Sequence, residues 1–384
     1  MFKKLIKGGL FMSLVKTINL NSMFNYDSQS LKLFTKEIVN KIKELVGDKE
    51  YVIMEFCGTH THEISRYALR SILPKNLELR SGPGCPVCVT SEEDIDYIIN
   101  LVLENDLGVI TFGDIINVPG SVASLSYLRA MGKDVKVVYN PMESIKIAES
   151  NHNKNYVLVG IGFETTVPML AHTLINIKQK RLKNLFYLSL HKLTPPATMV
   201  LLDSNEVKLD GIIGPGHVST IIGSKAWEDI AYKYRIPFVI MGFEPQDMLF
   251  GIYVLLEKII NKEYGVWNTY LRSVRYEGNK KALELIFKVF RISSANWRGL
   301  GVIPNSGLEL NNEFKEYDAK LRFPLTKEIK VKKTACRCGD VLRGVIKPYE
   351  CPLFAKACKP SSPKGPCMVS SEGSCAAYYL YEMN

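Results

Sequence analysis

The placement of its cysteines constrains this chain more than any other feature of the sequence. Nine cysteines occur in 384 residues, and they fall into two groups separated by a long cysteine-free stretch. Three lie early, at Cys57, Cys85 and Cys88, and six lie between residues 336 and 375. An odd number in a long chain without a convincing secretory signal argues against a disulfide framework. The pattern instead indicates a cytoplasmic protein with a metal-binding or redox-active tail.

The composition excludes several classes of protein. Hydrophobic residues make up 46% of the chain and charged residues 23%, values typical of globular proteins. No stretch approaches the roughly 20 uninterrupted apolar residues of a transmembrane helix, so we expect no membrane partner. A net charge of +10 is modest for this length and does not indicate a nucleic-acid partner. Residues 1–29 are predicted to be a disordered N-terminal extension, because Lys16 interrupts their apolar run and no small-residue cleavage site follows.

Short apolar segments alternate with helical patterns from about residue 51 to residue 245. We expect strands at 51–56, 109–112, 135–139, 156–161, 185–190, 211–213 and 238–241. Such alternation predicts an α/β fold in which parallel sheets are covered by helices. These strands suit two doubly wound parallel-sheet domains facing a cleft, at 30–150 and 151–262, better than one larger sheet. Residues 263–384 are predicted to form a third region, which contains the cysteine-rich tail.

Polar and reactive side chains follow most of these strands. In open α/β sheets ligands bind beyond the carboxyl ends of the strands, so these positions are candidate site positions. Outside the cysteine motifs they carry Asp114, Glu164, His191, Lys192, His217, Glu244 and Asp247. Each residue alone is more typical of a helix cap or an ion pair than of a catalyst. Glu164, His191 and His217 nevertheless join the candidate catalytic set.

The segment CGTHTH, at residues 57–62, leaves a predicted strand and enters a helix, with Thr61 as the expected N-cap. A thiol at such a junction experiences the helix dipole, which stabilises the thiolate form of Cys57. His60 and His62 add nitrogen ligands or a base, and thiolate with imidazole suits zinc, copper or iron. A buried structural cysteine is the alternative, but the two histidines favour a functional site.

The segment SGPGCPVC, at residues 81–88, places Cys85 and Cys88 in a C-x-x-C turn ahead of a helix. Thr90 and Glu93 match a capping box at the start of that helix. The spacing supports either a reversible disulfide or half of a tetrahedral metal site. Because no second C-x-x-C motif occurs, we favour a dithiol–disulfide switch.

The tail holds more cysteines than the four that a [4Fe–4S] cluster or an all-cysteine zinc site needs. Taking one set of four as ligands leaves two beside the site: Cys336, Cys351, Cys358 and Cys375 as ligands, and Cys338 and Cys367 as the remaining pair. That pair could form a disulfide able to exchange electrons with a cluster. The spacing favours a small iron–sulfur domain over a zinc domain, and composition alone leaves other sets of four open.

Further motifs accompany the cysteines along the chain. They are FGD at 112–114, GFETT at 162–166, HKLTPPA at 191–197, GPGHVS at 214–219, GFEP at 242–245, WRGLG at 297–301 and SGL at 306–308. Together with the two early cysteine motifs and the tail, they resemble the hydrogenase maturation HypD family. The resemblance covers residues 30 to 384, so no single motif carries it.

The resemblance implies a redox-active assembly scaffold, rather than a conventional turnover enzyme, for the Fe(CN)2CO unit of [NiFe]-hydrogenase. Proteins of this family work with the small chaperone HypC and accept cyanide from HypE. Carried onto this chain, Cys57 is implied as a ligand of the iron, with His60 assisting, and the C-x-x-C pair as a redox dithiol. The four tail ligands named above are implied to bind a [4Fe–4S] cluster, with Cys338 and Cys367 as a redox pair near it.

Two other functions remain open from the residues alone. A freestanding thiol–disulfide or ferredoxin-dependent oxidoreductase would need the C-x-x-C pair and the cluster, but not CGTHTH. A binding protein with a structural zinc tail would need neither the C-x-x-C pair nor two additional cysteines.

Overall fold

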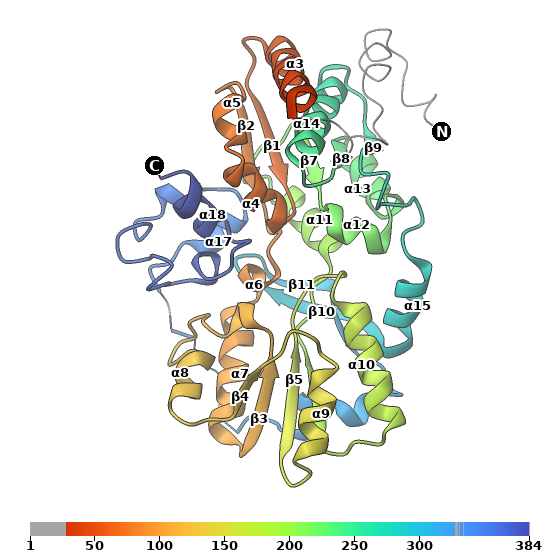
Figure 1. Cartoon of the computed structure of the whole chain (residues 1–384), viewed down its shortest axis with the longest axis vertical. Helices are drawn as coiled ribbons and strands as arrows, with labels where there is room; N and C mark the ends of the chain where they lie inside the picture. Colours follow the sequence, from red (N-terminus) through yellow and green to blue (C-terminus); the bar gives the residue numbers. More distant parts are fainter. Residues whose placement is uncertain (1–27, 327–328, 330, 333, 384) are drawn as a thin grey trace.

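Two parallel sheets make up most of the molecule, one above the other in Figure 1, and the cysteine-rich tail lies beside the upper sheet. The computed structural model describes residues 28–326, 329, 331–332 and 334–383. The predicted N-terminal extension therefore lies almost entirely outside the described residues. Within these ranges, no helix has the length and apolar character needed to cross a membrane.

The upper sheet has five parallel strands in the order β2-β1-β7-β8-β9. They are β1 (Tyr51–Glu55), β2 (Leu77–Ser81), β7 (Gly211–Gly214), β8 (Pro237–Ile240) and β9 (Gly265–Asn268). Helix α14 (Pro245–Ile260) packs on β7 and β8 and against α3 (Ser28–Val46). Aliphatic side chains from these strands and helices form one buried core, which fixes the carboxyl end of β1 in place.

The lower sheet has four parallel strands in the order β4-β3-β5-β6. They are β3 (Leu107–Thr111), β4 (Val135–Val137), β5 (Asn155–Gly160) and β6 (Leu185–Ser189). Its main helices are α7 (Glu92–Glu104), α9 (Glu143–Ser150) and α10 (Val167–Gln179). Strand β3 is buried along its whole length, as expected for a parallel strand covered on both faces.

An antiparallel hairpin lies between the two sheets (Figure 1). It consists of β10 (Phe290–Trp297) and β11 (Gly301–Leu310), and it follows α15 (Lys280–Val289). Two isolated bridges attach it to the rest of the chain, one from Trp297 to Thr90 and one from Gly307 to Lys192. The hairpin thus contacts both the segment after the C-x-x-C pair and the loop after β6.

The tail is built from short elements, including α17 (Cys338–Leu342), η6 (Pro366–Met368) and α18 (Ser374–Tyr381). Helix α18 packs against α4 (Gly58–Arg66), while α17 and η6 both pack against α6 (Pro86–Val89). Buried side chains of the tail and of α6 belong to one apolar cluster. The tail is therefore docked on both early cysteine motifs.

The predicted fold class, with two parallel sheets and a cysteine-rich region, is confirmed, but the predicted domain boundary at 150/151 falls inside the lower sheet. Strand β3 lies before this boundary and β5 after it, and the two pair with Leu107 opposite Asn155. The upper sheet is likewise assembled from distant segments, because β1 pairs with β7. Apolar patterns locate strands but do not show which strands are neighbours. A cleft between the two sheets stays a prediction.

Sequence patterns do not predict β2, β9 or the hairpin. In β2 the apolar residues alternate with Glu78 and Arg80, which pair with each other at 2.9 Å on the more exposed face. A strand buried on one face lacks the continuous apolar run by which parallel strands are recognised. Strand β9 lies after residue 262, where the sequence no longer shows a regular alternation of apolar and helical segments.

Candidate functional site

The Cys57 loop is held against the loop that follows β2. Strand β1 ends at Glu55, and Cys57 is the N-cap residue of α4. The backbone N–H of Gly58 donates to the Gly84 carbonyl at 2.8 Å, and the Gly82 N–H donates to the Glu55 carbonyl at 2.8 Å. A β-carbon on Gly84 would lie 2.4 Å from the Cys57 nitrogen. The absence of a side chain at Gly84 therefore allows the segment entering the C-x-x-C turn to touch the Cys57 backbone.

Cys57 is a buried, free thiol. Burial, followed by the nearby carboxylates of Glu372 and Glu55, raises the pKa of this thiol to about 12, against the effect of backbone N–H groups at the start of α4. The backbone N–H groups at the start of α4 do favour the thiolate form, as expected, but burial and the acidic neighbours outweigh them. Cys57 is thus a protonated thiol that would release its proton on binding a metal ion.

Glu55 is a site residue that the sequence analysis missed. Its carboxylate accepts the Cys57 N–H at 2.9 Å and the hydroxyl proton of Thr61. Burial raises the pKa of Glu55 to about 8, although these hydrogen bonds act in the opposite direction. Thr61 is not the N-cap, since α4 begins at Gly58 and Thr61 lies within its first turn. An acidic residue at the end of an otherwise apolar strand was the available signal.

His60 presents an unused nitrogen beside this loop. Its Nε2 lies 3.1 Å from the carbonyl oxygen of Gly242, to which it donates, and its ring stacks on Phe243 with centroids 4.6 Å apart. Its Nδ1 is buried and has no hydrogen-bond partner in the part of the chain that the structure describes. Burial lowers the pKa of His60 to about 4, so the ring is neutral near pH 7. A neutral histidine that donates one N–H to a carbonyl and keeps the other nitrogen free is typical of a metal ligand.

Two further histidines of the candidate set, His217 and His62, have different surroundings. His217 stacks on Phe243 with centroids 4.0 Å apart, so Phe243 contacts both His217 and His60. His62 instead points to the tail, where its Nδ1 lies 3.0 Å from the Ser371 carbonyl oxygen. The structure therefore brings His60 and His217 together and places His62 in the contact with the tail.

The C-x-x-C pair forms a disulfide in a buried turn. Cys85 and Cys88 have α-carbons 5.2 Å apart, and the sulfur of Cys85 accepts the Cys88 N–H at 3.1 Å. Cys85 is the N-cap of α6, and Pro86 occupies its first turn. A thiol at a helix N-cap is well placed for reversible oxidation.

The predicted capping box after this turn does not form, and the N-cap lies one residue later. Helix α7 is capped by Ser91, whose hydroxyl accepts the Asp94 N–H at 3.1 Å. Thr90 instead donates to the Pro86 carbonyl at 2.9 Å, and Glu93 accepts from Asn296 at 3.0 Å. The prediction of a Thr90–Glu93 capping box is therefore wrong. Thr90 is the C-cap residue of α6, and its hydroxyl donates to a carbonyl of that helix instead.

All six tail cysteines line one small cavity, together with apolar side chains such as Phe354 and Met368. Cys338 and Cys367 form a disulfide with α-carbons 6.3 Å apart, and the other four are free thiols. A β-carbon on Gly365 would lie 2.4 Å from the sulfur of Cys336. Across the described ranges, no group of three or more His, Cys, Asp or Glu side chains is arranged to hold a single metal ion.

The four free thiols of this cavity influence one another. Burial and then the neighbouring thiols raise the pKa of Cys375, and burial with the same neighbours raises the pKa of Cys336 to about 11. Their charged forms repel each other, so positive charge would be needed to hold all four as thiolates. Four such thiols around one cavity fit the four-cysteine donor set of an iron–sulfur cluster.

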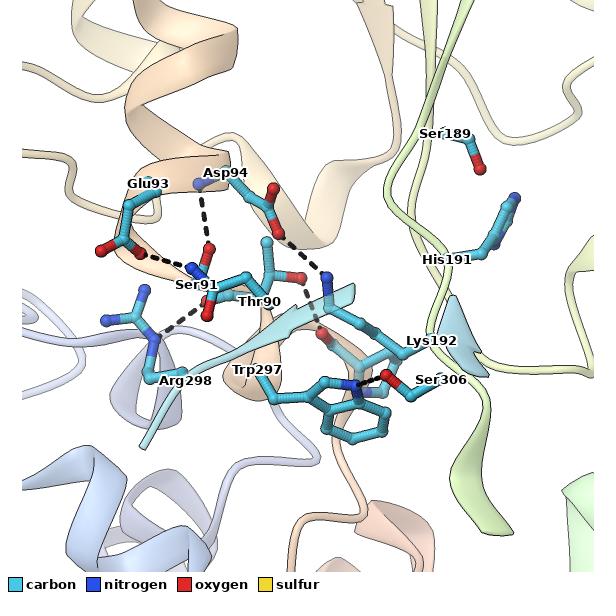
Figure 2. Close-up of polar contacts among 12 residues, drawn as sticks. Thr90, Ser91, Glu93, Asp94, Ser189, His191, Lys192, Trp297, Arg298 and Ser306 are labelled. Atoms are coloured by element: carbon cyan, nitrogen blue, oxygen red, sulfur yellow. Dashed lines mark hydrogen bonds and ion pairs between the residues drawn. The ribbon is translucent and has the colours of Figure 1, made fainter. Parts of the chain in front are cut away.

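Glu164, His191 and Lys192 lie at the carboxyl end of the lower sheet. His191 accepts from Tyr187 at 2.5 Å through Nε2, and burial lowers its pKa to about 4. Glu164 accepts the N–H of Thr194 at 2.8 Å. His191 and Lys192 line a cavity of about 290 Å³ beside the hairpin, where Figure 2 shows their side chains. Their hydrogen bonds stay within this part of the molecule and do not join the Cys57 loop.

Comparison with known proteins finds matches to one family along nearly the whole chain. The family profile described as HypD: Hydrogenase formation hypA family matches residues 33–382. The chain is 44% identical to hydrogenase maturation factor HypD2 of Bradyrhizobium diazoefficiens over 342 residues, which is 87% of this chain and 90% of that protein. It is 42% identical to hydrogenase maturation factor HypD of Cupriavidus necator, covering 87% of this chain and 90% of the relative. It is 40% identical to HypD of Escherichia coli, covering 90% and 94%.

Proposed function

The chain belongs to the HypD family of hydrogenase maturation factors, as its motifs predict, and from this premise we propose that it is a scaffold for assembling the Fe(CN)2CO unit of [NiFe]-hydrogenase. The observation that carries the proposal is a buried free thiol, Cys57, followed three residues later by His60, whose buried Nδ1 has no partner among the described residues. Thiolate and imidazole are ligands that iron accepts, and burial shields a bound iron from solvent.

The residues around Cys57 would manage the proton that iron binding releases. The Cys57 thiol must lose its proton to become a ligand. Glu55 holds the Cys57 backbone through a hydrogen bond of 2.9 Å, and burial raises its pKa to about 8. A carboxyl group with this pKa can exchange a proton near neutral pH. We therefore assign Glu55 to positioning the Cys57 loop and to proton exchange with it.

The C-x-x-C pair would deliver the electrons that cyanide transfer requires. In the proposed step a thiocyanate carrier R–S–C≡N and the reduced dithiol of Cys85 and Cys88 yield R–SH, CN⁻, one proton and the disulfide. Two electrons pass from the dithiol to the S–CN bond, whose cleavage leaves cyanide for the iron. The contact between the Cys57 backbone and Gly84 supports this assignment, because the segment entering the dithiol turn touches Cys57, the proposed iron ligand.

The tail would return electrons to that disulfide. Its free thiols Cys336, Cys351, Cys358 and Cys375 would hold a [4Fe–4S] cluster, which supplies one-electron transfer when bound. Packing of α17 and η6 against α6 supports a short route from the Cys338–Cys367 pair to the C-x-x-C pair. An external protein reductant must supply the electrons.

The proposal includes two protein partners and a compartment. A HypC-type chaperone would add a further cysteine to the iron, and a HypE-type protein would carry the cyanide. A cytoplasmic location suits the free cysteines, because reducing compartments preserve such thiols. A freestanding thiol–disulfide or ferredoxin-dependent oxidoreductase is the second candidate, and the disulfide in the C-x-x-C turn favours it.

Replacement of Cys57 separates these two functions. We expect Cys57→Ala and Cys57→Ser to abolish maturation of a [NiFe]-hydrogenase in a strain that lacks its own HypD, because neither replacement supplies a thiolate. Serine preserves the size of the side chain, so it controls for loss of packing. Both variants should keep the melting temperature of the wild-type protein and the visible absorbance of its tail. Normal hydrogenase activity with either variant would contradict the scaffold and leave the oxidoreductase.

A further inference from the structure

Arg298 joins the hairpin to the segment that follows the C-x-x-C pair. Its backbone N–H donates to the Val89 carbonyl at 2.8 Å, and its Nε donates to the Thr90 carbonyl at 3.0 Å. Its Nη1 forms an ion pair with Glu92. Figure 2 shows the guanidinium lying beside this segment, and Trp297, the last residue of β10, forms a bridge to Thr90. Arg298 thus holds three of the four residues that follow Cys88, namely Val89, Thr90 and Glu92, through its backbone and its side chain.

The guanidinium of Arg298 is not fully used by these contacts. The side chain is only 6% exposed, and its buried Nη2 has no hydrogen-bond partner among the residues that the structure describes. A guanidinium has five N–H donors and stays charged at any physiological pH. A buried donor without a partner is costly, so this end of the side chain is available to a group that the polypeptide itself does not provide.

The chain next to Arg298 also contacts the tail. The backbone after Arg298 touches the residue after Cys338, since a β-carbon on Gly299 would lie 2.6 Å from the Gly339 α-carbon. Burial lowers the pKa of Arg298, and Glu92 and then Cys336 act in the opposite direction. The positive charge of Arg298 therefore acts on Cys336, one of the four thiols of the tail cavity.

We propose that Arg298 is a positioning residue that couples the two sulfur centres, because it fixes the segment after Cys88 and presents a buried positive charge to Cys336. This inference rests on the proposed function, in which Cys336 is a cluster ligand. Net charge and hydrogen bonds near the sulfurs set the reduction potential of an iron–sulfur centre. A cation in a buried position stabilises the extra electron of the reduced form more than an exposed cation does. Arg298 would thus raise the potential of the tail centre while holding the electron acceptor in place.

Neutral and charged replacements of Arg298 test this coupling. The proteins are loaded anaerobically with iron and sulfide, and the midpoint potential is followed by electron paramagnetic resonance during a redox titration. Arg298→Met should shift the equilibrium between the reduced and oxidised cluster toward the oxidised form by at least about tenfold. This corresponds to a midpoint potential lower by about 59 mV for a one-electron couple. Arg298→Lys should stay close to the wild-type potential, although lysine cannot reproduce the directed hydrogen bonds. A residue with only a structural role would affect both variants alike.

Arg337 provides the matched control. It lies between Cys336 and Cys338 in the sequence, but its side chain is 44% exposed and pairs with Asp340. Arg337→Met should shift the same redox equilibrium of the cluster by less than about threefold, because solvent screens exposed charges. If Arg298→Met does not fold, Arg298→Gln removes the same charge and can still donate to the Thr90 carbonyl.

The outcomes separate this inference from the proposed function. Equal potentials for the Arg298→Met, Arg337→Met and wild-type proteins, each with normal iron and sulfide content, would overturn the role of Arg298 and leave the scaffold unaffected. A wild-type protein that takes up no cluster would overturn the proposed cofactor, and the coupling with it.

Discussion

Replacement of Glu164 by glutamine should remove a pH-dependent loss of stability from the protein. Glu164 is buried, and its carboxylate accepts the Thr194 N–H at 2.8 Å and the Thr194 hydroxyl at 3.1 Å. Burial raises the pKa of Glu164 from 4.5 to about 7, although the hydrogen bonds oppose this change. Glutamine keeps a carbonyl oxygen for Thr194 and cannot ionise.

The direction of the effect follows from proton binding. Because the pKa of Glu164 is higher in the folded protein, the folded state binds more protons than the unfolded state between pH 4.5 and about 7. The stabilisation is complete below pH 4.5 and is lost as the pH rises through about 7. A difference of 2.5 pKa units corresponds to about 3 kcal/mol, of which about 2 to 3 kcal/mol falls between pH 5 and pH 8.

Urea unfolding at several pH values from about 5 to about 8 measures this effect directly. The free energy of unfolding of Glu164→Gln, minus that of the wild type, should increase by about 2 to 3 kcal/mol across this range. The difference at pH 5 serves as the internal reference for any loss of packing. A difference that stays constant with pH would refute the assignment of a raised pKa to Glu164.

Two further substitutions test the packing around the sites. Lys192 is 2% exposed and pairs with Asp94 at 2.9 Å, so Lys192→Met should cost about 3 kcal/mol of unfolding free energy by leaving Asp94 without its partner. The double variant Lys192→Met, Asp94→Asn should recover part of this loss. A loss in the double variant equal to the sum of the losses in the two single variants would contradict the importance of the pair. Gly84→Ala should cost about 1 to 3 kcal/mol and reduce iron retention at Cys57, because the new β-carbon would lie 2.4 Å from the Cys57 nitrogen. Gly113→Ala is the control, since its nearest contact would be at 3.9 Å, and equal effects of the two would contradict the reasoning.

Much of the fold could be predicted from local patterns, and the remainder depends on contacts between distant segments. The strand that ends at Glu55 is recognisable because its apolar run is short and is followed by glycine and a helical pattern. Its neighbours are not recognisable, because β1 pairs with β7, more than a hundred residues later. Because these pairings join segments far apart in the sequence, local patterns do not show that the lower sheet is inserted between parts of the upper one.

The residues of the candidate site likewise fall into those that local patterns predict and those that only the folded structure shows. Cys57 and the C-x-x-C pair could be found because reactive residue types at strand ends and helix starts are unusual. Glu55 and Arg298 could not be singled out, since an isolated Glu or Arg is common and their importance comes from burial. Arg298 acts on residues 89–92, about two hundred positions away, through a hairpin that no local pattern predicts.

The most direct test of the central claim is an infrared spectrum of the chain purified anaerobically together with a HypC-type partner. The scaffold predicts cyanide and carbonyl stretching bands in the wild-type complex and their absence from the Cys57→Ala complex, with broad visible absorbance near ~400 nm in both. A wild-type complex that carries the visible absorbance but shows no cyanide or carbonyl bands would contradict assembly of the Fe(CN)2CO unit on this protein.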